Sequence, residues 1–491
     1  MLFNSAAYLV FLPIVVALYW VMPFRYRTAF LLLASYIFYM TWKPIYLVLI
    51  VALTAFNYFA GIAIEKQKVH RKLALVGALA ANILTLAYFK YAYFAIDASN
   101  SVLAIAGRKI SYPLQEIILP LGISFFVFEF IHYLVDVYKG SPAVKAPLEF
   151  ALFPSFFPTQ IAGPIKRFQD FVPQLHKPAK INLKDFDEGV ELILWGLFKK
   201  VIVADSVAVV IDKCMPHPEM LSTFDCWSLL WAFAIQVYFD FSGYTDIARG
   251  SAALLGFKVP LNFDLPFLAG SITEYWRRWH ISLSLWLRDY LFFPLGGSKH
   301  GTLATIRNVM ITFTLAGLWH GAGLNYIIFG AMHGFWLNCN RLWRIQVEKS
   351  AFLLKLTETK LFHCFGVVLT FNCLAITLVT FRLPNLELSG RYFQKLFMLS
   401  PQAANSPSIN PLAMTIPSIE GPANFALFPV ILISIVIGHL VSNQLRGKSE
   451  PGVLPLPKPL QVLRPAYLAA IAILLLLFAP DGTPSFVYFQ F

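Results

Sequence analysis

Long apolar runs, interrupted by short polar segments, are the dominant pattern along the chain. About 20 apolar residues are enough for a helix to cross the hydrocarbon core of a bilayer, where each backbone polar group must be paired within the segment. The alternation of polar and apolar residues that is typical of strands is not seen. We therefore expect an all-α polytopic membrane protein. The predicted spans are 5–22, 28–62 (a bent pair around Trp42, Lys43 and Pro44), 73–95, 117–137, 187–211, 226–250, 303–319, 324–343, 361–382, 423–442 and 464–480.

Two apolar stretches do not fit a simple span. The first, 153–164, contains three prolines, so it cannot form a continuous lipid-facing helix. Non-helical backbone at membrane depth requires surrounding protein or a cavity, which predicts a re-entrant or interfacial segment. The second, 261–297, mixes aromatic residues with acidic and basic ones. It predicts amphipathic helices that lie at the cytoplasmic face or dip into it.

The composition excludes an ordinary soluble protein. Hydrophobic residues make up 58% of the chain and charged residues only 13%, whereas globular chains average about a quarter charged. The net charge of +13 comes from short basic clusters between apolar segments, which is typical of cytoplasmic loops and not of a nucleic-acid-binding face. We expect one integral membrane domain over 1–491, with a periplasmic loop at 384–422 and a cytoplasmic linker at 443–463.

Five cysteines show neither a CxxC pair nor the spacing of a zinc site. Cys214 and Cys226 flank a short loop, and we expect two free thiols there, with a disulfide as the alternative. Cys339, Cys364 and Cys373 lie in apolar segments and are expected to be small core residues.

The densest polar chemistry on an apolar background lies between Tyr238 and Gly334. Ionisable residues inside membrane segments are costly unless they face a cavity or a partner, so they are functional candidates. His320 lies at the junction of two apolar helices, beside glycines that allow close approach. Burial favours a neutral imidazole, which can take a proton from a hydroxyl. A histidine at a helix end could equally cap backbone carbonyls, and position alone does not separate the two roles.

His280 follows two arginines that could bind an anionic cofactor. On a helix Arg277 would share a face with His280, and arginine forks bind phosphate bidentately. The alternative is an interfacial belt in which tryptophans anchor the segment and Arg277 and Arg278 reach the lipid headgroups. From the residues alone this belt is the favoured interpretation.

Other polar residues of this region are better explained by packing. Asp240 and Asp246 could orient a base or bind a sugar hydroxyl, but a buried network with arginines of 277–288 is favoured. His333 lies 13 residues after His320, too far to share one helical face, so we expect it to pack between helices. The sequence contains no P-loop, no HExxH and no GxSxG motif, and no metal-ligand cluster. Nucleotide-driven pumps, zinc proteases and α/β-hydrolases therefore have no support.

Six segments occur in a consistent order along nearly the whole chain: 160–165 (QIAGPI), 240–246 (DFSGYTD), 276–284 (WRRWHISLS), 287–290 (LRDY), 317–322 (GLWHGA) and 488–491 (YFQF). Together they resemble the membrane-bound O-acyltransferase (MBOAT) family, and within it the bacterial branch of alginate O-acetyltransferase membrane subunits. The resemblance implies a ring of about 11–13 helices around a central funnel or tunnel, with re-entrant and interfacial helices. It also reverses the interpretation of His280 as part of an interfacial belt.

The resemblance assigns roles to particular residues. It implies that His320 is the catalytic histidine of a Trp-His-Gly motif and that His280 is a second catalytic histidine. Arg277 and Arg278 become phosphate contacts for a donor, acetyl-CoA, with no permanently bound cofactor and no metal. The residues expected to hold the histidines in place are Asp240, Asp246, Arg288, Asp289 and Trp319.

The resemblance further implies that acetyl groups cross a bacterial inner membrane for O-acetylation of an exported polysaccharide, with alginate as the first candidate. The expected partners are periplasmic proteins of the SGNH-esterase type and membrane lipid, with the polysaccharide reached indirectly and no nucleic acid. Three alternatives stay open: peptidoglycan O-acetylation, D-alanyl transfer to teichoic acid, and, from another class, a transporter for a polysaccharide or a lipid-linked precursor.

Overall fold

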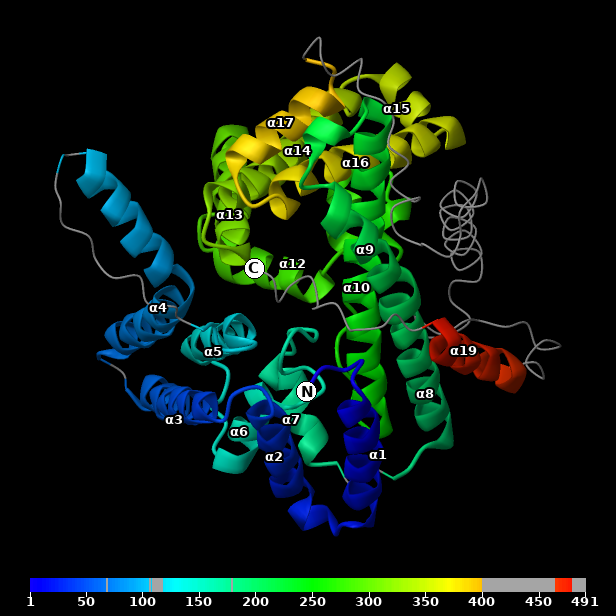
Figure 1. Cartoon of the computed structure of the whole chain (residues 1–491). Coiled ribbons are helices and arrows are strands. Elements are labelled where there is room, and N and C mark those ends of the chain that lie inside the picture. Colours follow the sequence, from blue (N-terminus) through cyan, green and yellow to red (C-terminus); the bar gives the residue numbers. More distant parts are fainter. Residues whose placement is uncertain (68, 106, 108–117, 178–179, 400–463, 479–491) are drawn as a thin grey trace. The chain divides into compact units, whose positions relative to one another are not determined.

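The computed structural model describes residues 1–67, 69–105, 107, 118–177, 180–399 and 464–478. Within these ranges every regular element is a helix and no strand occurs (Figure 1). The all-α fold class predicted from the apolar runs is therefore confirmed. The described residues divide into two compact units, one within 1–193 and 247–260 and the other within 194–246, 261–399 and 464–478.

The first unit begins with four helices that match the predicted spans. The expected bent pair over 28–62 is two separate helices, because the chain turns at Thr41 and Trp42 and the next helix starts after Pro44. Proline is well suited to the start of a helix, where its missing N–H has no intrahelical partner. The helices of this unit are α1 (Ala6–Val21), α2 (Phe24–Met40), α3 (Ile45–Lys66), α4 (Arg71–Ile105), α5 (Ile123–Tyr138), α6 (Pro147–Ser155) and α7 (Phe168–Leu175).

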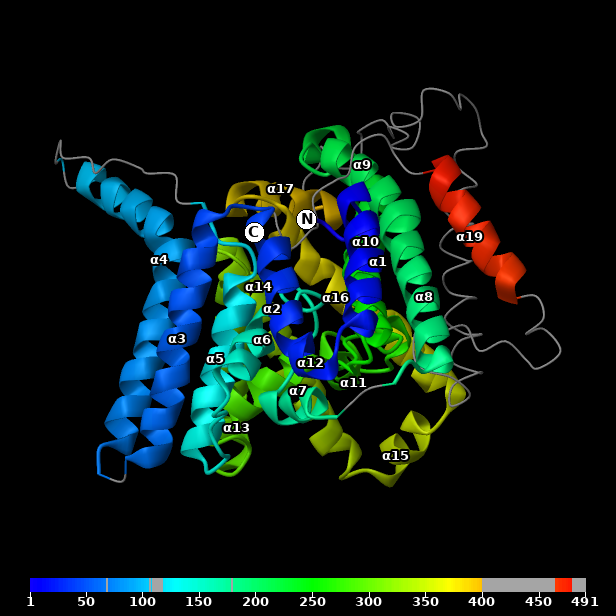
Figure 2. The same cartoon turned by 90° about the horizontal axis from the view of Figure 1, so that it is seen from below.

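Helices α3 and α4 lie side by side (Figure 2). A reciprocal amide pair joins them: the Nδ2 atom of Asn57 donates to Oδ1 of Asn82 at 3.0 Å, and Asn82 Nδ2 donates back to Asn57 Oδ1 at 2.8 Å. Both side chains are fully buried. Amide hydrogen bonds of this kind join helices inside a bilayer, where apolar packing alone gives little specificity.

The proline-broken stretch 153–164 is not a continuous helix, as its prolines predict. Helix α6 ends at Ser155, and the backbone from Phe156 to Arg167 is irregular. Every side chain from Leu152 to Lys166 is buried, so protein surrounds this non-helical segment. The Oγ atom of Ser35 in α2 accepts a hydrogen bond from the backbone N–H of Phe157 at 3.1 Å, which pairs one of the backbone groups that a helix would otherwise have paired.

The second unit contains the long helix α10 and the segments that follow it. It contains two π-helices, η1 and η4, and each is continuous with a neighbouring α-helix. The elements, two of which extend into the first unit, are α8 (Leu183–Leu197), η1 (Phe198–Ala204), α9 (Asp205–Cys214), η2 (Pro218–Met220), α10 (Thr223–Leu254), η3 (Pro266–Leu268), α11 (Ile272–Arg278), α12 (Ile281–Leu287), η4 (Arg288–Phe292), α13 (Gly301–His320), α14 (Leu324–Val347), α15 (Ala351–Thr357), α16 (Lys360–Arg382), α17 (Leu386–Leu396) and α19 (Arg464–Phe478).

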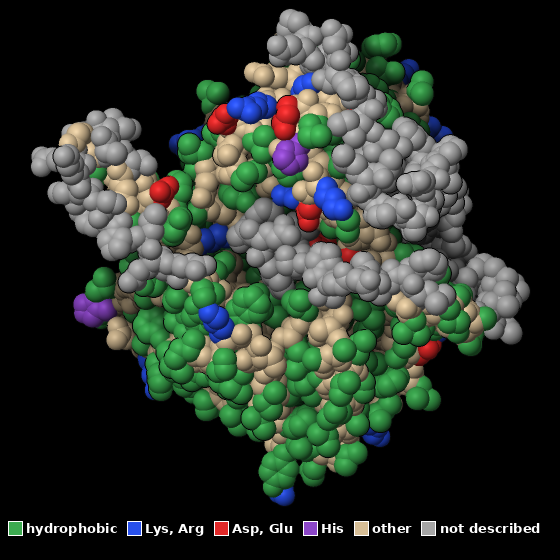
Figure 3. Space-filling model, viewed as in Figure 1, with side chains coloured by type: hydrophobic (Ala, Val, Ile, Leu, Met, Phe, Trp, Pro, Cys, Tyr) green, Lys and Arg blue, Asp and Glu red, His purple; other side chains and the backbone are tan. Residues whose placement is uncertain are grey.

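Three helices of the described part are long and apolar enough to cross a membrane: α3, α16 and the stretch Arg71–Asn100 of α4. Exposed apolar side chains also cover α1 and α2; Leu9, Val10 and Leu33 are each more than half exposed. Hydrophobic side chains gather over much of the face drawn in Figure 3. Contiguous apolar surface of this extent needs a non-aqueous environment, so the chain is a membrane protein.

Some expectations are corrected and others fall outside the described residues. All five cysteines are free thiols, as favoured for Cys214 and Cys226, but Cys339 and Cys364 are exposed and Cys373 is half-buried. The prediction of three small core residues was therefore wrong, because apolar segments of a membrane protein turn much of their surface to lipid. The expected loop 384–422 begins with helix α17. Residues 400–463, which include the predicted span 423–442 and the linker 443–463, lie outside the described residues.

Candidate active site

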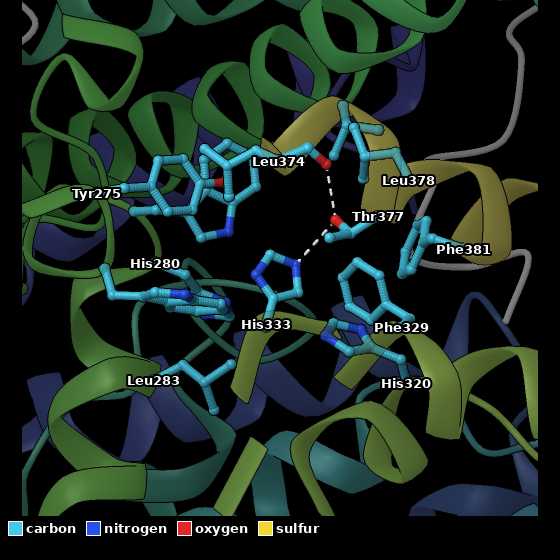
Figure 4. Close-up of a pocket in the computed structure, with 13 residues that line it drawn as sticks. Tyr275, His280, Leu283, His320, Phe329, His333, Leu374, Thr377, Leu378 and Phe381 are labelled. Carbon is cyan, nitrogen blue, oxygen red and sulfur yellow. Dashed lines mark hydrogen bonds between the residues drawn. The ribbon is translucent and has the colours of Figure 1, made fainter. Parts of the chain in front are cut away.

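A small pocket in the second unit is lined by three histidines among aromatic and aliphatic side chains (Figure 4). His280, His320 and His333 come from three different elements and face the same space. The cavity measures about 30 Å³, enough for roughly two water molecules. Its lining therefore combines imidazoles, which can take up protons, with walls that leave little room for water.

The hairpin of α13 and α14 positions two of the histidines (Figure 1). His320 is the last residue of α13, and α14 starts after Gly323. A Cβ atom on Gly330 would lie 2.1 Å from the carbonyl oxygen of Phe313, and one on Gly317 would lie 2.8 Å from Gly330 Cα. Only glycine permits this approach, so these two positions set how closely the helices pack.

His320 is half-buried and surrounded by aromatic rings. Its ring centroid lies 4.7 Å from that of Trp319, 5.6 Å from Phe329 and 5.4 Å from Phe381. The expected supporting residue Trp319 therefore contacts His320 directly. All three contacts are close to edge-on, an arrangement that orients the imidazole.

His280 occupies a backbone conformation that few residues other than glycine adopt. Its φ of 40° and ψ of 56° are left-handed, and it stands between the end of α11 and the start of α12. Strained backbone of this kind persists where the surroundings fix it. Asn262 does so here: its carbonyl accepts from the N–H of Ile281 at 3.0 Å, and its Oδ1 accepts from the hydroxyl of Ser282 at 2.6 Å.

The imidazole of His280 is only 1% exposed. Phe241 of α10 packs edge-on against it, with ring centroids 4.7 Å apart. Among the described residues its Nε2 atom has no hydrogen-bond partner. A buried polar atom without a partner is unusual in a folded protein, and a ligand is one of its ordinary explanations.

His333 also lines this pocket. The sequence predicted only that it packs between helices. The 13-residue spacing excludes one shared face only if the helix is continuous, and the turn at 321–323 reverses the chain between His320 and His333. Phe329 lies between the two imidazoles, 4.7 Å from the His333 ring. The glycines in and beside the turn were visible in the sequence and could have revealed the hairpin.

Arg277 and Arg278 do not lie where a continuous helix through His280 would place them. Because α11 ends at Arg278 and His280 is left-handed, Arg277 does not share a helical face with His280. Arg278 Nη2 is 2.5 Å from a carboxylate oxygen of Glu274, one turn earlier. Arg277 is exposed, and neither arginine lines the pocket.

The aspartates of α10 form a buried network with lysines. Lys200 Nζ lies 2.8 Å from Oδ1 of Asp240 and 2.6 Å from Oδ1 of Asp205. Lys199 Nζ lies 2.5 Å from Oδ2 of Asp246. Both lysines belong to η1, whose π-helical geometry inserts an extra residue per turn. The buried network that the sequence predicts is present, and these lysine partners were not foreseen.

The remaining predicted residues lie outside the pocket. Arg288 and Asp289 form an ion pair of 2.7 Å within η4, where Arg288 is half exposed. Phe241, the neighbour of Asp240 in the chain, contacts His280. In the described part of the chain no group of three His, Cys, Asp or Glu side chains could hold a metal ion. The pocket therefore offers imidazole chemistry in an aromatic enclosure.

Comparison with known proteins gives a consistent result. A model of the membrane-bound O-acyltransferase family, MBOAT, matches residues 146–380, which contain all three histidines. A protein from Pseudomonas syringae pv. tomato named "Probable alginate O-acetylase AlgI" is 42% identical over 403 residues, which cover 81% of this chain and 75% of that protein. The "Peptidoglycan O-acetyltransferase" of Helicobacter pylori is 34% identical over 79% of this chain and 78% of its own length.

A more distant relative is the "Teichoic acid D-alanyltransferase" of Bacillus subtilis, which is 29% identical over 62% of this chain and 80% of its own length. All three relatives are named for the transfer of an acyl group, so the similarity follows the reaction class as well as the sequence. With relatives above 30% identity matched over three quarters of their length, the chain belongs to the membrane-bound O-acyltransferase family.

Proposed function

We propose that this acyltransferase moves acetyl groups from cytoplasmic acetyl-CoA across the bacterial inner membrane for O-acetylation of an exported polysaccharide, with alginate as the substrate. The observation that carries the proposal is the pocket itself: His280 and His320, from motifs far apart in the chain, line one enclosed space. A thioester donor and a hydroxyl acceptor need a group that accepts a proton or the acyl group, and imidazole can do either.

The size of the pocket supports a short acyl group. A cavity of about 30 Å³ has room for roughly two water molecules, a size that suits a two-carbon acyl group better than a long fatty chain. A charged coenzyme cannot cross lipid, whereas its acetyl group needs only a narrow passage. Transfer of the group alone separates the cytoplasmic donor from an acceptor on the other side.

Arg277 is the arginine that suits the phosphates of the donor. Glu274 already engages the guanidinium of Arg278, whereas Arg277 is exposed. A free guanidinium can bind a phosphate bidentately. The two roles then differ: Arg278 stabilises the end of α11 just before His280, and Arg277 binds the coenzyme.

Alginate is proposed because the relatives of about 40% identity are named as alginate O-acetylases, whereas the named peptidoglycan and teichoic acid enzymes are 34% and 29% identical. Peptidoglycan O-acetylation is the second candidate, since that relative matches nearly the same share of the chain. In either case we propose that periplasmic proteins of the SGNH-esterase type receive the acetyl group and pass it to the polymer.

The test uses the full chain in membrane vesicles supplied with labelled acetyl-CoA, the periplasmic SGNH-type proteins and alginate. We expect label in polymer ester groups with the wild type, and none with His320→Ala at equal levels of inserted protein. His217→Ala is the matched control, because this histidine is 58% exposed and lies outside the pocket. Normal polymer acetylation by His320→Ala contradicts the assignment, and an unlabelled polymer with the wild type favours the transporter alternative.

The same vesicles test the donor contact. Arg277→Gln should raise the KM for acetyl-CoA several-fold with little change in kcat, because uniform binding of the donor is lost. Arg391→Gln is the control, since this exposed arginine of α17 pairs only with Glu387 among the described residues. An unchanged KM in Arg277→Gln removes the arginine from the donor site.

A further inference from the structure

The pocket contains buried polar atoms whose part in the proposed reaction is not assigned. Nδ1 of His333, Nε2 of His280 and Nε1 of Trp276 all belong to residues that line it. Each atom is buried and has no hydrogen-bond partner among the described residues. His280 and His333 are 1% and 4% exposed, so bulk water does not satisfy them. Three unpaired polar atoms around one cavity indicate a polar ligand.

Thr377 determines which nitrogen of His333 carries the proton. Its hydroxyl donates to the carbonyl oxygen of Leu374 at 2.7 Å. The same oxygen lies 3.1 Å from Nε2 of His333 (Figure 4). A hydroxyl has one proton, so Thr377 must accept at this second contact and Nε2 of His333 must donate. Nδ1 of the neutral ring is then a hydrogen-bond acceptor, buried and facing the pocket.

Trp276 supplies the complementary donor. Its ring stands edge-on to that of His333, with centroids 5.1 Å apart. An indole Nε1 can only donate, whereas the Nδ1 atom of this His333 tautomer can only accept. A hydroxyl group is both an acceptor and a donor, so one hydroxyl can satisfy both atoms. A carbonyl oxygen or an ammonium group can satisfy only one of them.

We propose that Trp276 and His333 form the acceptor subsite, in which an alcohol hydroxyl accepts from Trp276 Nε1 and donates to His333 Nδ1. This inference rests on the proposed acyl transfer and names the residue that removes the proton of the acceptor. His333 is the catalytic residue of this subsite, and Thr377 is a positioning residue that acts through it. The alcohol is a sugar hydroxyl or the serine hydroxyl of a partner protein, which share this chemistry.

The O–H bond of the alcohol breaks, and its proton moves to Nδ1 of His333. The alcohol oxygen forms a bond with the acyl carbon, whether that carbon is still on the donor sulfur or has passed to His320, and the bond to that leaving group breaks. If the acyl group is still on the donor, the proton then passes from His333 to the thiolate, which leaves as a free thiol. If the acyl group has passed to His320, the thiol has already left with the proton of the His320 N–H, and the proton passes from His333 to the released imidazole nitrogen of His320. The product is an ester in both cases.

His333→Asn gives the sharpest test, because an amide can accept a hydrogen bond near the position of Nδ1 but cannot take up a proton. The assay uses purified full-length protein in lipid nanodiscs with acetyl-CoA and, in separate arms, an alginate oligosaccharide and a serine peptide. We expect kcat to fall at least about 100-fold, with the KM for the accepted alcohol changed less than about threefold. The arm that yields ester identifies the source of the hydroxyl.

Thr377 provides the matched pair of variants. Thr377→Val keeps the shape of the side chain and removes the hydroxyl, so the His333 tautomer is no longer fixed and kcat should fall about tenfold. Thr377→Ser keeps the hydroxyl and should restore kcat to within about twofold of the wild type. Nitrogen NMR of histidine-labelled protein should show the Nε2–H tautomer of His333 in the wild type and a mixture in Thr377→Val.

Trp276→Phe removes the indole N–H and keeps an aromatic ring, so it should raise the KM for the alcohol several-fold. Wild-type kinetics in His333→Asn, while His320→Ala remains inactive, overturns the subsite and leaves the proposed function intact. Equal losses in Thr377→Val and Thr377→Ser also overturn it, because packing and not the hydroxyl would then be responsible. Absence of ester from the wild type in both arms overturns the proposed function itself.

Discussion

Two buried polar regions of the second unit differ in whether their polar groups are charged. The lysine cluster, formed by Lys200 with Asp205 and Asp240, consists of charged groups that pair at 2.6 and 2.8 Å. The histidine pocket has no carboxylate or guanidinium in its lining. Adjacent residues of α10 serve the two regions, because Asp240 faces Lys200 and Phe241 packs against His280.

This difference indicates a structural role for the lysine cluster and a chemical role for the histidine pocket. A charge in an apolar environment must be paired, and removing one partner of a buried pair is strongly destabilising. A neutral imidazole needs no counter-ion, so the pocket can leave nitrogen atoms such as His280 Nε2 available to a substrate. We therefore expect substitutions in the lysine cluster to reduce folding, and substitutions in the pocket to reduce turnover in a folded protein.

The largest expected effect is on Lys200→Met. This variant leaves the carboxylates of Asp205 and Asp240 buried without their cation, at a cost of about 3–5 kcal/mol in the free energy of unfolding. The yield of monodisperse protein after detergent extraction should fall sharply. Lys213→Met is the control, because this lysine of α9 is exposed. A normal yield and melting temperature for Lys200→Met would show that the cluster is not structural.

The second prediction concerns the glycine contact that holds the α13–α14 hairpin. In Gly330→Ala the new Cβ atom would lie 2.1 Å from the carbonyl oxygen of Phe313, so the helices must separate. Overpacking of this kind costs about 1–3 kcal/mol, and the shift moves His320 and His333 relative to each other. Acetyl transfer should fall more than tenfold. Gly77→Ala in α4, where no atom lies within 4 Å of the added Cβ, should leave both properties unchanged.

The smallest predicted effect is a change in acyl selectivity. Phe381 packs 5.4 Å from the His320 ring and helps to enclose the pocket, so Phe381→Ala should enlarge the space beside the imidazole. The ratio of kcat/KM for propionyl-CoA to that for acetyl-CoA should rise about tenfold, since each methylene is worth about 1–3 kcal/mol. Phe365→Ala, on the exposed side of α16, is the control. An unchanged ratio would mean that Phe381 does not limit acyl length.

Several features were accessible from sequence because they depend on neighbouring residues. The apolar runs predicted the helices, and the three prolines of 153–164 predicted a buried non-helical segment, as observed. The predicted spans 303–319 and 324–343 placed a helix junction at His320, and the junction lies between α13 and α14. In each case the signal is local: an apolar run or a missing backbone N–H.

The failures share a different cause. Arg277 was placed on the face of His280 because a helix was assumed to continue through both residues. The left-handed backbone of His280 shows that it does not. Asp240 was paired with arginines of 277–288, whereas the fold pairs it with Lys200, which is about as far away along the chain. The cysteines were placed in a core because apolar segments were equated with buried ones.

The sequence by itself determined where the helices run, that the chain needs a lipid environment, and that His280 and His320 carry the candidate chemistry. Only the tertiary structure decided that His333 joins them and that Thr377 fixes its tautomer. The physical reason is that helix formation depends on residues a few positions apart, whereas a pocket depends on distances between segments that only packing brings together. Close approach at Gly317 and Gly330 sets those distances for two of the three histidines.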